Sequence, residues 1–461
     1  MGFDLHDLDR IVSLTHPVIH PLDAFVVMVY KRVANDKKSY ESRLLVAGPG
    51  TPARFLTGGP KDAHPAFSAD GRFLWFIRSQ DDRGQRLMRL PWEGGEAEPV
   101  GPKFWDLAMV KPIPGGDGVL VLARAPEPPP EEPQWPRHYQ RWQWQYDGQR
   151  YFPDHPISLW HVDGQGQTTR LEESVYDIAS VSISPDGRFV VYDRITDETA
   201  AAVPRSDIYR LNLTASASPE RMTDGPKSWR APTVLGDGRI VALASGQDFG
   251  PATIEELYEV APTNRRLPLP PDLEVGESIS SDTRFGPEPI RPLAVGTSGV
   301  AIAATQQGQT HVWIVDGVQA EPLGVPAPVA AQYAANGSRV VVIGGSLTAL
   351  DEAYWCENGI AQPITEVNHW AREKITPTEI ISITRPDGMA IPAYVTGMEE
   401  RQPRPLILYV HGGPHGAYGE NVRYDTQVMV QNGYVVAQVN PRGSMGYGQA
   451  FRNAVRSDWG G

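Results

Sequence analysis

Short apolar runs, each introduced by a tight turn, recur along the first 365 residues of the chain. Seven of these turns occupy equivalent positions, namely Asp23, Asp70, Asp117, Asp186, Asp237, Ser298 and Asn336. Most of them pair Asp or Asn with Gly, which suits the positive φ angles of two-residue hairpin turns. The runs that follow, such as "GRFLWFI" and "GRFVVY", are rich in Val, Ile and aromatic residues, as buried strands are.

A second, alternating strand follows each run, as in "SRLLVAG" and "SDIYRLNLT", and a third short piece such as "ARFLTGG" often comes next. The steps between successive turns are 47, 47, 69, 51, 61 and 38 residues, which fit propeller blades with loop insertions. The pattern therefore predicts an all-β, seven-bladed β-propeller over residues 1–368, with a central channel. A β-sandwich with many hairpins is the alternative, and the repeated order of turn, strand and hairpin favours the propeller.

The longest step contains an insertion at about residues 124–157, which begins with the run "EPPPEEP". Such a Pro-Glu run is expected to be extended and solvated. The part from Trp135 to Phe152 is rich in Trp and Tyr among Arg and Gln. It is either an aromatic binding loop at a domain interface or an insertion that packs its aromatic rings on a neighbouring blade.

The pattern of apolar positions changes near residue 370. "TEIISITRPDGMAIPAYVTG" predicts a hairpin, and the continuous apolar run at 406–410 predicts a central strand of a covered sheet. "NVRYDTQVMVQNGY" has helical spacing and ends at a glycine, "VVAQVN" is a second buried strand, and "GQAFRNAVRSDW" begins another helix. Residues 369–461 are therefore predicted to form the first part of an α/β-hydrolase domain.

The turn after the first of these strands reads "HGGPHG", from His411 to Gly416. Glycines directly beyond a strand end let backbone N–H groups point into open space, where they can stabilise negative charge that develops on a carbonyl oxygen. A His-Gly-Gly motif at this place is typical of the oxyanion-hole loop of α/β-hydrolases. A plain turn is the alternative.

Together, "YVHGGPHG", "NGYVVAQVNPRGSMGYGQAF" and "DWGG" make the chain resemble the prolyl oligopeptidase family of serine peptidases. Within that family the pattern is closest to the acylaminoacyl-peptidase and dipeptidyl-peptidase-like branch. The resemblance implies a propeller that caps a hydrolase domain, an acyl-enzyme mechanism, short peptides as substrates, and no metal or organic cofactor. No Cys–His metal spacing or phosphate loop is visible in the sequence either.

The resemblance also implies a serine in a Gly-x-Ser-x-Gly turn, followed by Asp and His, and the sequence contains no such turn. Ser444 in "RGSMG" has Arg442 where the first glycine belongs, so it is not expected to be the nucleophile. We therefore expect the Ser-Asp-His triad beyond Gly461, in roughly 200 further residues of the same protein or a companion chain. The 461 residues alone are expected to be inactive, and their hydrolase part to fold poorly alone.

Six residues are candidates for the site. The N–H of Gly413 is the first candidate for an oxyanion donor, and that of Gly412 is the second. We expect His411 to bond to the loop backbone and Pro414 to fix the loop. Arg442 either positions substrate or forms an ion pair with a nearby carboxylate, and Tyr447 either lines the pocket or packs between its neighbours.

The net charge is −13, which argues against a general affinity for nucleic acid or for an anionic membrane. Cys356 is the single cysteine, no secretory leader is visible, and no apolar run is long enough to span a membrane. These features fit a cytoplasmic protein, which could be a homo-oligomer, and a cysteine-poor secreted protein would fit the single cysteine as well.

Two functions from different classes are compatible with the sequence. The first is a serine peptidase of the acylaminoacyl or oligopeptidase type, to which these residues supply the propeller gate and the oxyanion loop. The second is a non-catalytic interaction protein, in which the propeller binds a partner and the hydrolase part is a remnant. The intact "HGGPHG" and "PRGSMGYG" loops favour the peptidase, because a scaffold has no chemical reason to keep them.

Overall fold

The computed structural model describes residues 2–81, 84–124, 145–146, 150–151, 155–172, 176–197, 205–213, 217–286, 289–398 and 403–458. Most of the predicted insertion at 124–157, including the aromatic run from Trp135 to Phe152, lies outside the described residues. Between residues 125 and 154, the structure describes only the strands β11 (Gln145–Tyr146) and β12 (Arg150–Tyr151), which pair with each other.

Five antiparallel sheets of four strands follow one another along the first half of the chain. Blades 1 and 2 comprise β1 (Ser13–Ile19), β2 (Val26–Val33), β3 (Tyr40–Gly48), β4 (Thr51–Phe55), β5 (Asp62–Phe67), β6 (Phe73–Asp81), β7 (Gly84–Pro91) and β8 (Glu98–Phe104). Blades 3 to 5 comprise β9 (Leu107–Pro112), β10 (Val119–Ala123), β13 (Ser158–Val162), β14 (Thr168–Glu172), β15 (Ile178–Ile183), β16 (Phe189–Asp197), β17 (Arg205–Asn212), β18 (Glu220–Arg221), β19 (Ser228–Val234), β20 (Ile240–Ser245), β21 (Glu256–Ala261) and β22 (Arg265–Arg266).

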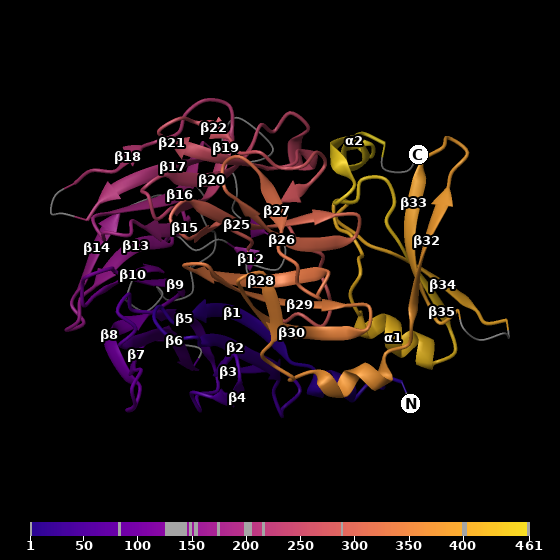
Figure 1. Ribbon diagram of the computed structural model, residues 1–461, viewed down its shortest axis with the longest axis horizontal. Coiled ribbons are helices and arrows are strands. Elements are labelled where there is room, and N and C mark those ends of the chain that lie inside the picture. Colours follow the sequence, from indigo (N-terminus) through magenta and orange to yellow (C-terminus); the bar gives the residue numbers. More distant parts are fainter. Residues whose placement is uncertain are drawn as a thin grey trace, which may run out of the picture.

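The last two blades are joined into one sheet by a single parallel residue pair, Thr310 with Val329. Blade 6 comprises β23 (Glu274–Val275), β24 (Leu293–Val295), β25 (Gly299–Gln306), β26 (Gln309–Val315) and β27 (Ala320–Pro322), and blade 7 comprises β28 (Val329–Asn336), β29 (Arg339–Ser346), β30 (Ala349–Glu357) and β31 (Ile360–Pro363). Each apolar run predicted from the sequence is a strand of one blade, so the seven-bladed propeller is confirmed (Figure 1).

No blade combines strands from the two ends of the propeller, because β1 belongs to blade 1 and β31 to blade 7. Contacts between these two blades therefore close the ring. Apolar side chains of both blades form one cluster, which includes Leu14, Val341 and Trp355. The buried side chain of Asn368 adds a polar clasp: Val12 N–H donates to its Oδ1 at 2.9 Å, and its Nδ2 donates to the carbonyl oxygens of Val12 and Asp351 at 2.8 and 2.9 Å. The ends of the ring are thus held by burial and by hydrogen bonds.

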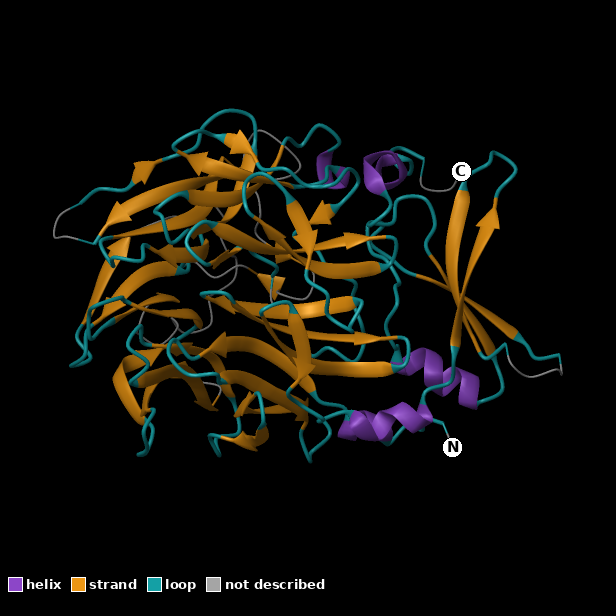
Figure 2. Cartoon of the chain, viewed as in Figure 1, coloured by secondary structure: helices purple, strands orange, loops and turns teal. Residues whose placement is uncertain are grey.

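The residues after the propeller form a separate lobe, at the right in Figure 1, which contains most of the helical turns (Figure 2). A 3-10 helix, η3 (His369–Lys374), leads into the hairpin of β32 (Thr378–Thr384) and β33 (Ala390–Thr396). The predicted strand, helix, strand and helix are β34 (Leu406–Val410), α1 (Tyr424–Gln431), β35 (Val435–Val439) and α2 (Gly448–Asn453). Since β34 and β35 pair in parallel, this part has the α/β character expected of the start of a hydrolase sheet. The domain boundary at residue 368 stays a prediction.

Within the described residues, the run at 406–410 is a strand, as predicted, but it is neither central nor covered. The sheet order is β32-β33-β35-β34, so β34 lies at the edge of the described sheet. Leu406, Leu408 and Val410 are 62%, 63% and 50% exposed, because no described segment packs on the face from which they project. An apolar pattern indicates which faces of a strand can be buried. Whether those faces are buried depends on the other segments that pack on them.

Replacement of the buried amide that closes the ring should destabilise the protein. We expect Asn368→Ala to lower the free energy of unfolding by about 2–4 kcal/mol, because it leaves buried backbone groups of Val12 and Asp351 without partners. Urea unfolding followed by circular dichroism measures the change. The control is Asn432→Ala, which removes one exposed hydrogen bond to Val428 O and should cost under about 1 kcal/mol. Equal losses in the two variants would contradict the clasp.

Candidate functional site

Two loops meet at one end of the small sheet. The loop 411–416 follows β34, and the loop 440–447 follows β35. The two strands are parallel neighbours whose last residues, Val410 and Val439, are paired in register. Since both loops leave the sheet at the same edge, residues 30 positions apart in the sequence come into contact. Ligands of α/β folds bind beyond the carboxyl ends of parallel strands, which is where these two loops lie.

The backbone of Gly412 and Gly413 is exposed at the first turn of the loop. Gly413 has φ +132°, and a Cβ on it would lie 2.8 Å from the backbone nitrogens of His415 and Gly416, so the turn requires glycine here. A Cβ on Gly412 would meet open space. Within the described part of the chain, neither N–H donates to a protein acceptor. Both donors are therefore available to a ligand.

Each ring nitrogen of His411 lies within hydrogen-bond distance of an oxygen atom. Its Nδ1 lies 2.9 Å from the carbonyl oxygen of Gly412, and its Nε2 lies 2.8 Å from Oγ of Ser444. Burial lowers the pKa of His411, which keeps the imidazole neutral, and a neutral ring donates to only one of these oxygens at a time. That His411 bonds to the loop backbone stays a prediction, because the contact of Nδ1 with Gly412 depends on which ring nitrogen carries the hydrogen.

Ser444 is fully buried and donates its hydroxyl hydrogen to the carbonyl oxygen of Pro441 at 2.7 Å. A nucleophile has to reach the substrate, and this hydroxyl is closed off from solvent. The serine–histidine pair formed by Ser444 and His411 therefore ties one loop to the other. The expectation that Ser444 is not the nucleophile agrees with this geometry.

A second contact between the two loops lies beside the first. Nδ1 of His415 is 2.8 Å from the carbonyl oxygen of Gly443, and the N–H of Met445 donates to the carbonyl oxygen of Gly416 at 3.3 Å. Pro414 follows Gly413 through a cis peptide bond and stands at the centre of the same turn. The sequence reasoning did not single out His415, although its place in "HGGPHG" is a signal that could have identified it.

Arg442 and Tyr447 lie on the flanks of the second loop. Arg442 forms an ion pair with Asp458, with Nη1 and Oδ2 3.7 Å apart. Of the two roles considered for Arg442, this contact corresponds to the ion pair with a nearby carboxylate. The hydroxyl of Tyr447 accepts a hydrogen bond at 2.9 Å from Asn440, and its ring packs on Phe451 at 5.1 Å between centroids. Tyr447 thus has a packing role in these contacts. Trp459 of "DWGG" lies outside the described residues.

A carboxylate of the propeller holds the second loop, and the sequence reasoning missed it. Glu274 in blade 6 is buried, and its Oε1 accepts from the N–H groups of Gly446 and Gly448 at 2.7 and 3.2 Å. Its Oε2 accepts from Arg452 at 2.7 Å, and Arg452 also donates to Glu277 at 3.0 Å. Burial raises the pKa of Glu274, and the guanidinium of Arg452 opposes that rise. The glycines of "GYG" were the available signal, because closely approached backbone N–H groups need them.

A second propeller carboxylate caps the helix that follows the first loop. Oδ1 and Oδ2 of Asp282 accept from the N–H groups of Tyr424 and Asp425, at 2.9 and 2.8 Å, in the first turn of α1. The first N–H groups of a helix have no partner within it, so a carboxylate there supplies both hydrogen bonds and favourable charge. The propeller thus fixes the small lobe at two points, one beside each loop.

The described residues contain no group of three or more His, Cys, Asp or Glu side chains placed to hold a metal ion. Among the same residues, no helix has the length and apolar character that crossing a membrane requires.

Comparison with known proteins shows which proteins this chain is similar to. The model of the prolyl oligopeptidase family matches residues 420–461. An uncharacterized peptidase of Bacillus subtilis, YuxL, is 28% identical over 486 residues, which cover 99% of this chain and 73% of that protein. Dipeptidyl-peptidase 5 of Aspergillus fumigatus is 26% identical over 299 residues, which cover 60% of this chain and 41% of that protein.

Solved structures share the fold over the whole chain. The acylaminoacyl peptidase of Pyrococcus horikoshii superposes with a TM-score of 0.78 at 18% identity, covering 98% of this chain and 68% of that one. A puromycin-hydrolyzing peptidase of Mycobacterium tuberculosis superposes with a TM-score of 0.70 at 18% identity, covering 98% and 70%. At such identities the superpositions establish the fold, namely a propeller followed by part of a hydrolase domain.

The interface clasp can be tested by removing one partner. Glu274→Gln leaves the buried guanidinium of Arg452 poorly compensated and should lower the free energy of unfolding by about 3 kcal/mol. Hydrogen exchange at the amides of Gly446 and Gly448 should accelerate, which mass spectrometry of peptides can follow. The matched control is Glu256→Gln in the exposed pair with Arg266, which should cost about 0–1 kcal/mol. Unchanged exchange at both glycines would contradict the clasp.

Proposed function

Because the comparisons confirm the similarity to the prolyl oligopeptidase family of serine peptidases, we propose that these 461 residues form the propeller gate and oxyanion loop of a peptidase that cleaves short peptides. The reaction would be acyl transfer of the acylaminoacyl or oligopeptidase type, through a covalent acyl-enzyme. The family resemblance, a relative named as a peptidase and the fold shared with peptidases support this proposal.

One observation carries the role of the loop. The N–H groups of Gly412 and Gly413 are exposed, and none of the described residues accepts a hydrogen bond from them. Acyl transfer converts a planar carbonyl into a tetrahedral intermediate whose oxygen is negatively charged. Donors that are in place beforehand stabilise that oxygen without reorganising during the reaction. Gly413 is the first candidate donor and Gly412 the second.

The catalytic serine, aspartate and histidine are proposed to come from polypeptide outside these 461 residues, in the same protein or in a companion chain. The sequence contains no Gly-x-Ser-x-Gly turn, and Ser444 is buried. His411, Pro414, Arg442 and Tyr447 then support the loops rather than react. The proposal includes a cytoplasmic location and no role for nucleic acid, membrane or cofactor.

Two glycine variants test the oxyanion role in the catalytically complete protein. Gly413→Ala should reduce kcat by about 10²–10³-fold on acetyl-aminoacyl p-nitroanilides with little change in KM, because the strained turn moves its N–H away from the developing charge. The matched control is Gly324→Ala, at an exposed glycine between β27 and β28 of the propeller. A Cβ there meets open space, so kcat should stay within about threefold of the parent.

The proposal as a whole is tested by labelling with a fluorophosphonate that reacts with activated serines. The 461-residue chain should remain unlabelled and inactive, whereas the catalytically complete protein should gain the mass of one phosphonyl group and lose activity. If the complete protein were neither labelled nor active on any short peptide, the non-catalytic interaction protein would be the better hypothesis. If both glycine variants lost kcat equally, Gly413 would no longer be assigned as the oxyanion donor, and the rest of the proposal would stand.

A further inference from the structure

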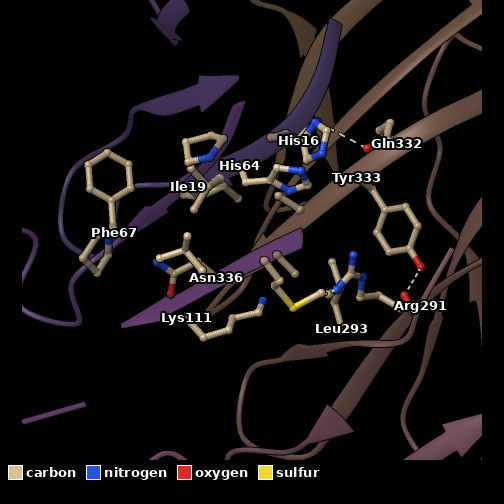
Figure 3. A pocket seen from close by; sticks show the side chains of 18 of the residues that line it. His16, Ile19, His64, Phe67, Lys111, Arg291, Leu293, Gln332, Tyr333 and Asn336 are labelled. Carbon is tan, nitrogen blue, oxygen red and sulfur yellow. Dashed lines mark hydrogen bonds between the residues drawn. The ribbon is translucent and has the colours of Figure 1, made fainter. Parts of the chain in front are cut away.

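A cavity of about 320 Å³ lies inside the ring of blades, apart from the loops described above. Its walls come from the innermost strands β1, β5, β9, β24 and β28, which belong to five of the seven blades. Figure 3 shows the side chains that project into it. A volume of this size suits a small ligand and excludes a folded protein.

The cavity occupies the half of the channel that is remote from the hydrolase part. Val329, at the start of β28, packs against Ala417 and Met445 of the second lobe. The cavity is lined instead by the later part of the same strand, up to Asn336, and by the turn residue Ser68 of blade 2. It therefore forms an antechamber at the distal mouth of the channel, and we use that name below.

Four side chains that carry or can carry positive charge line the antechamber: His16, His64, Lys111 and Arg291. They come from four separate parts of the chain, and the amino group of Lys111 and the guanidinium of Arg291 approach from opposite sides in Figure 3. None of the described residues that line the antechamber is Asp or Glu. This is a local excess of cationic groups in a protein whose net charge is −13.

Backbone geometry directs the two histidines inward. His16 and His64 occupy equivalent bulges of β1 and β5, each with φ +51°. Bulges of this kind re-aim a side chain, and a left-handed conformation is costly for a residue other than glycine. The two rings meet edge to face, with centroids 4.2 Å apart. Two blades thus use the same uncommon conformation to bring imidazoles together at the wall of the channel.

We propose that the antechamber binds a carboxylate, specifically the carboxy-terminal end of a short peptide. Lys111 and Arg291 would donate charge-assisted hydrogen bonds to the carboxylate. The apolar side chains of Ile19, Phe67 and Leu293 line the same cavity and would contact the peptide's own side chain. That mixture of charge and apolar surface suits the end of a peptide better than an inorganic anion, which has no apolar part.

The proposal does not require any of these side chains to lack a protein partner. A guanidinium has five N–H donors and an ammonium has three, so each can bind a ligand oxygen in addition to a protein group. Arg291, for example, donates to Sδ of Met109 at 3.7 Å through one nitrogen. The preference for an anion rests on the donors of Lys111 and Arg291 among the described lining residues, and the choice of a peptide as its carrier rests on the proposed function.

Binding of a matched pair of peptides tests the proposal without any hydrolysis. Acetyl-D-Ala-D-Ala with a free carboxylate should bind the full chain at least about tenfold more tightly than its carboxamide at low salt, as isothermal titration calorimetry measures. The double variant Lys111→Gln, Arg291→Gln should lose that difference. The control, Lys38→Gln with Arg188→Gln, removes the same charge from exposed sites and should keep it.

Each other outcome has a definite meaning. Equal binding of acid and amide by the unmodified protein would overturn the proposal, even if the variants failed to fold. Inorganic phosphate that bound as tightly as the acid peptide would overturn the peptide assignment and leave a general anion site. Since the probes are not cleaved, acid-selective binding in a protein without peptidase activity would refute the proposed function and retain the anion site.

Discussion

The buried carboxylate of Glu274 is the contact on which the arrangement of the site depends. A carboxylate removed from water is unfavourable unless it is fully hydrogen bonded, and Glu274 meets that condition only when the loop of Gly446 and Gly448 and the side chain of Arg452 are in place. The propeller and the second lobe therefore cannot shift relative to each other by even one hydrogen-bond length without cost. An apolar contact would allow sliding, whereas this contact fixes the register of the two parts.

That fixed register extends to the exposed glycines through two further contacts. The loop held by Glu274 also carries Ser444 and Gly443, which bind His411 and His415 on either side of Gly412–Gly413. The position of the donors is thus linked to a residue of blade 6 through two side-chain contacts, and no part of the second lobe alone determines it. In this arrangement the propeller does more than restrict access, because it sets the geometry at the place where charge would develop.

Local patterns predicted the fold well, and long-range contacts explain what they could not predict. The seven turns from Asp23 to Asn336 mark real blades because a hairpin turn depends on its own two residues. The "HGGPHG" loop was identifiable for the same reason. Glu274 and Asn368 have no such local signal, since their roles arise from partners 172 and 356 positions away. The apolar run of β34 was read correctly as a strand, but its coverage depends on segments that the run itself does not encode.

The contacts with the second lobe and the lining of the antechamber differ in the charged side chains that they contain. At the end that faces the second lobe, Glu274 and Asp282 present carboxylates that are already bound to Arg452 and to the start of α1. At the distal end, the antechamber presents cations. A peptide lying along the channel with its carboxylate in the antechamber would point its amino end toward the loop of Gly412–Gly413. The innermost strand β28 spans eight residues, or about 25 Å at a rise of about 3.3 Å per residue. Residues Ala331 to Asn336 of this strand line the antechamber, and Val329 contacts the second lobe. A peptide that occupied both sites would therefore have to extend from the antechamber past Val329 to the loop of Gly412–Gly413.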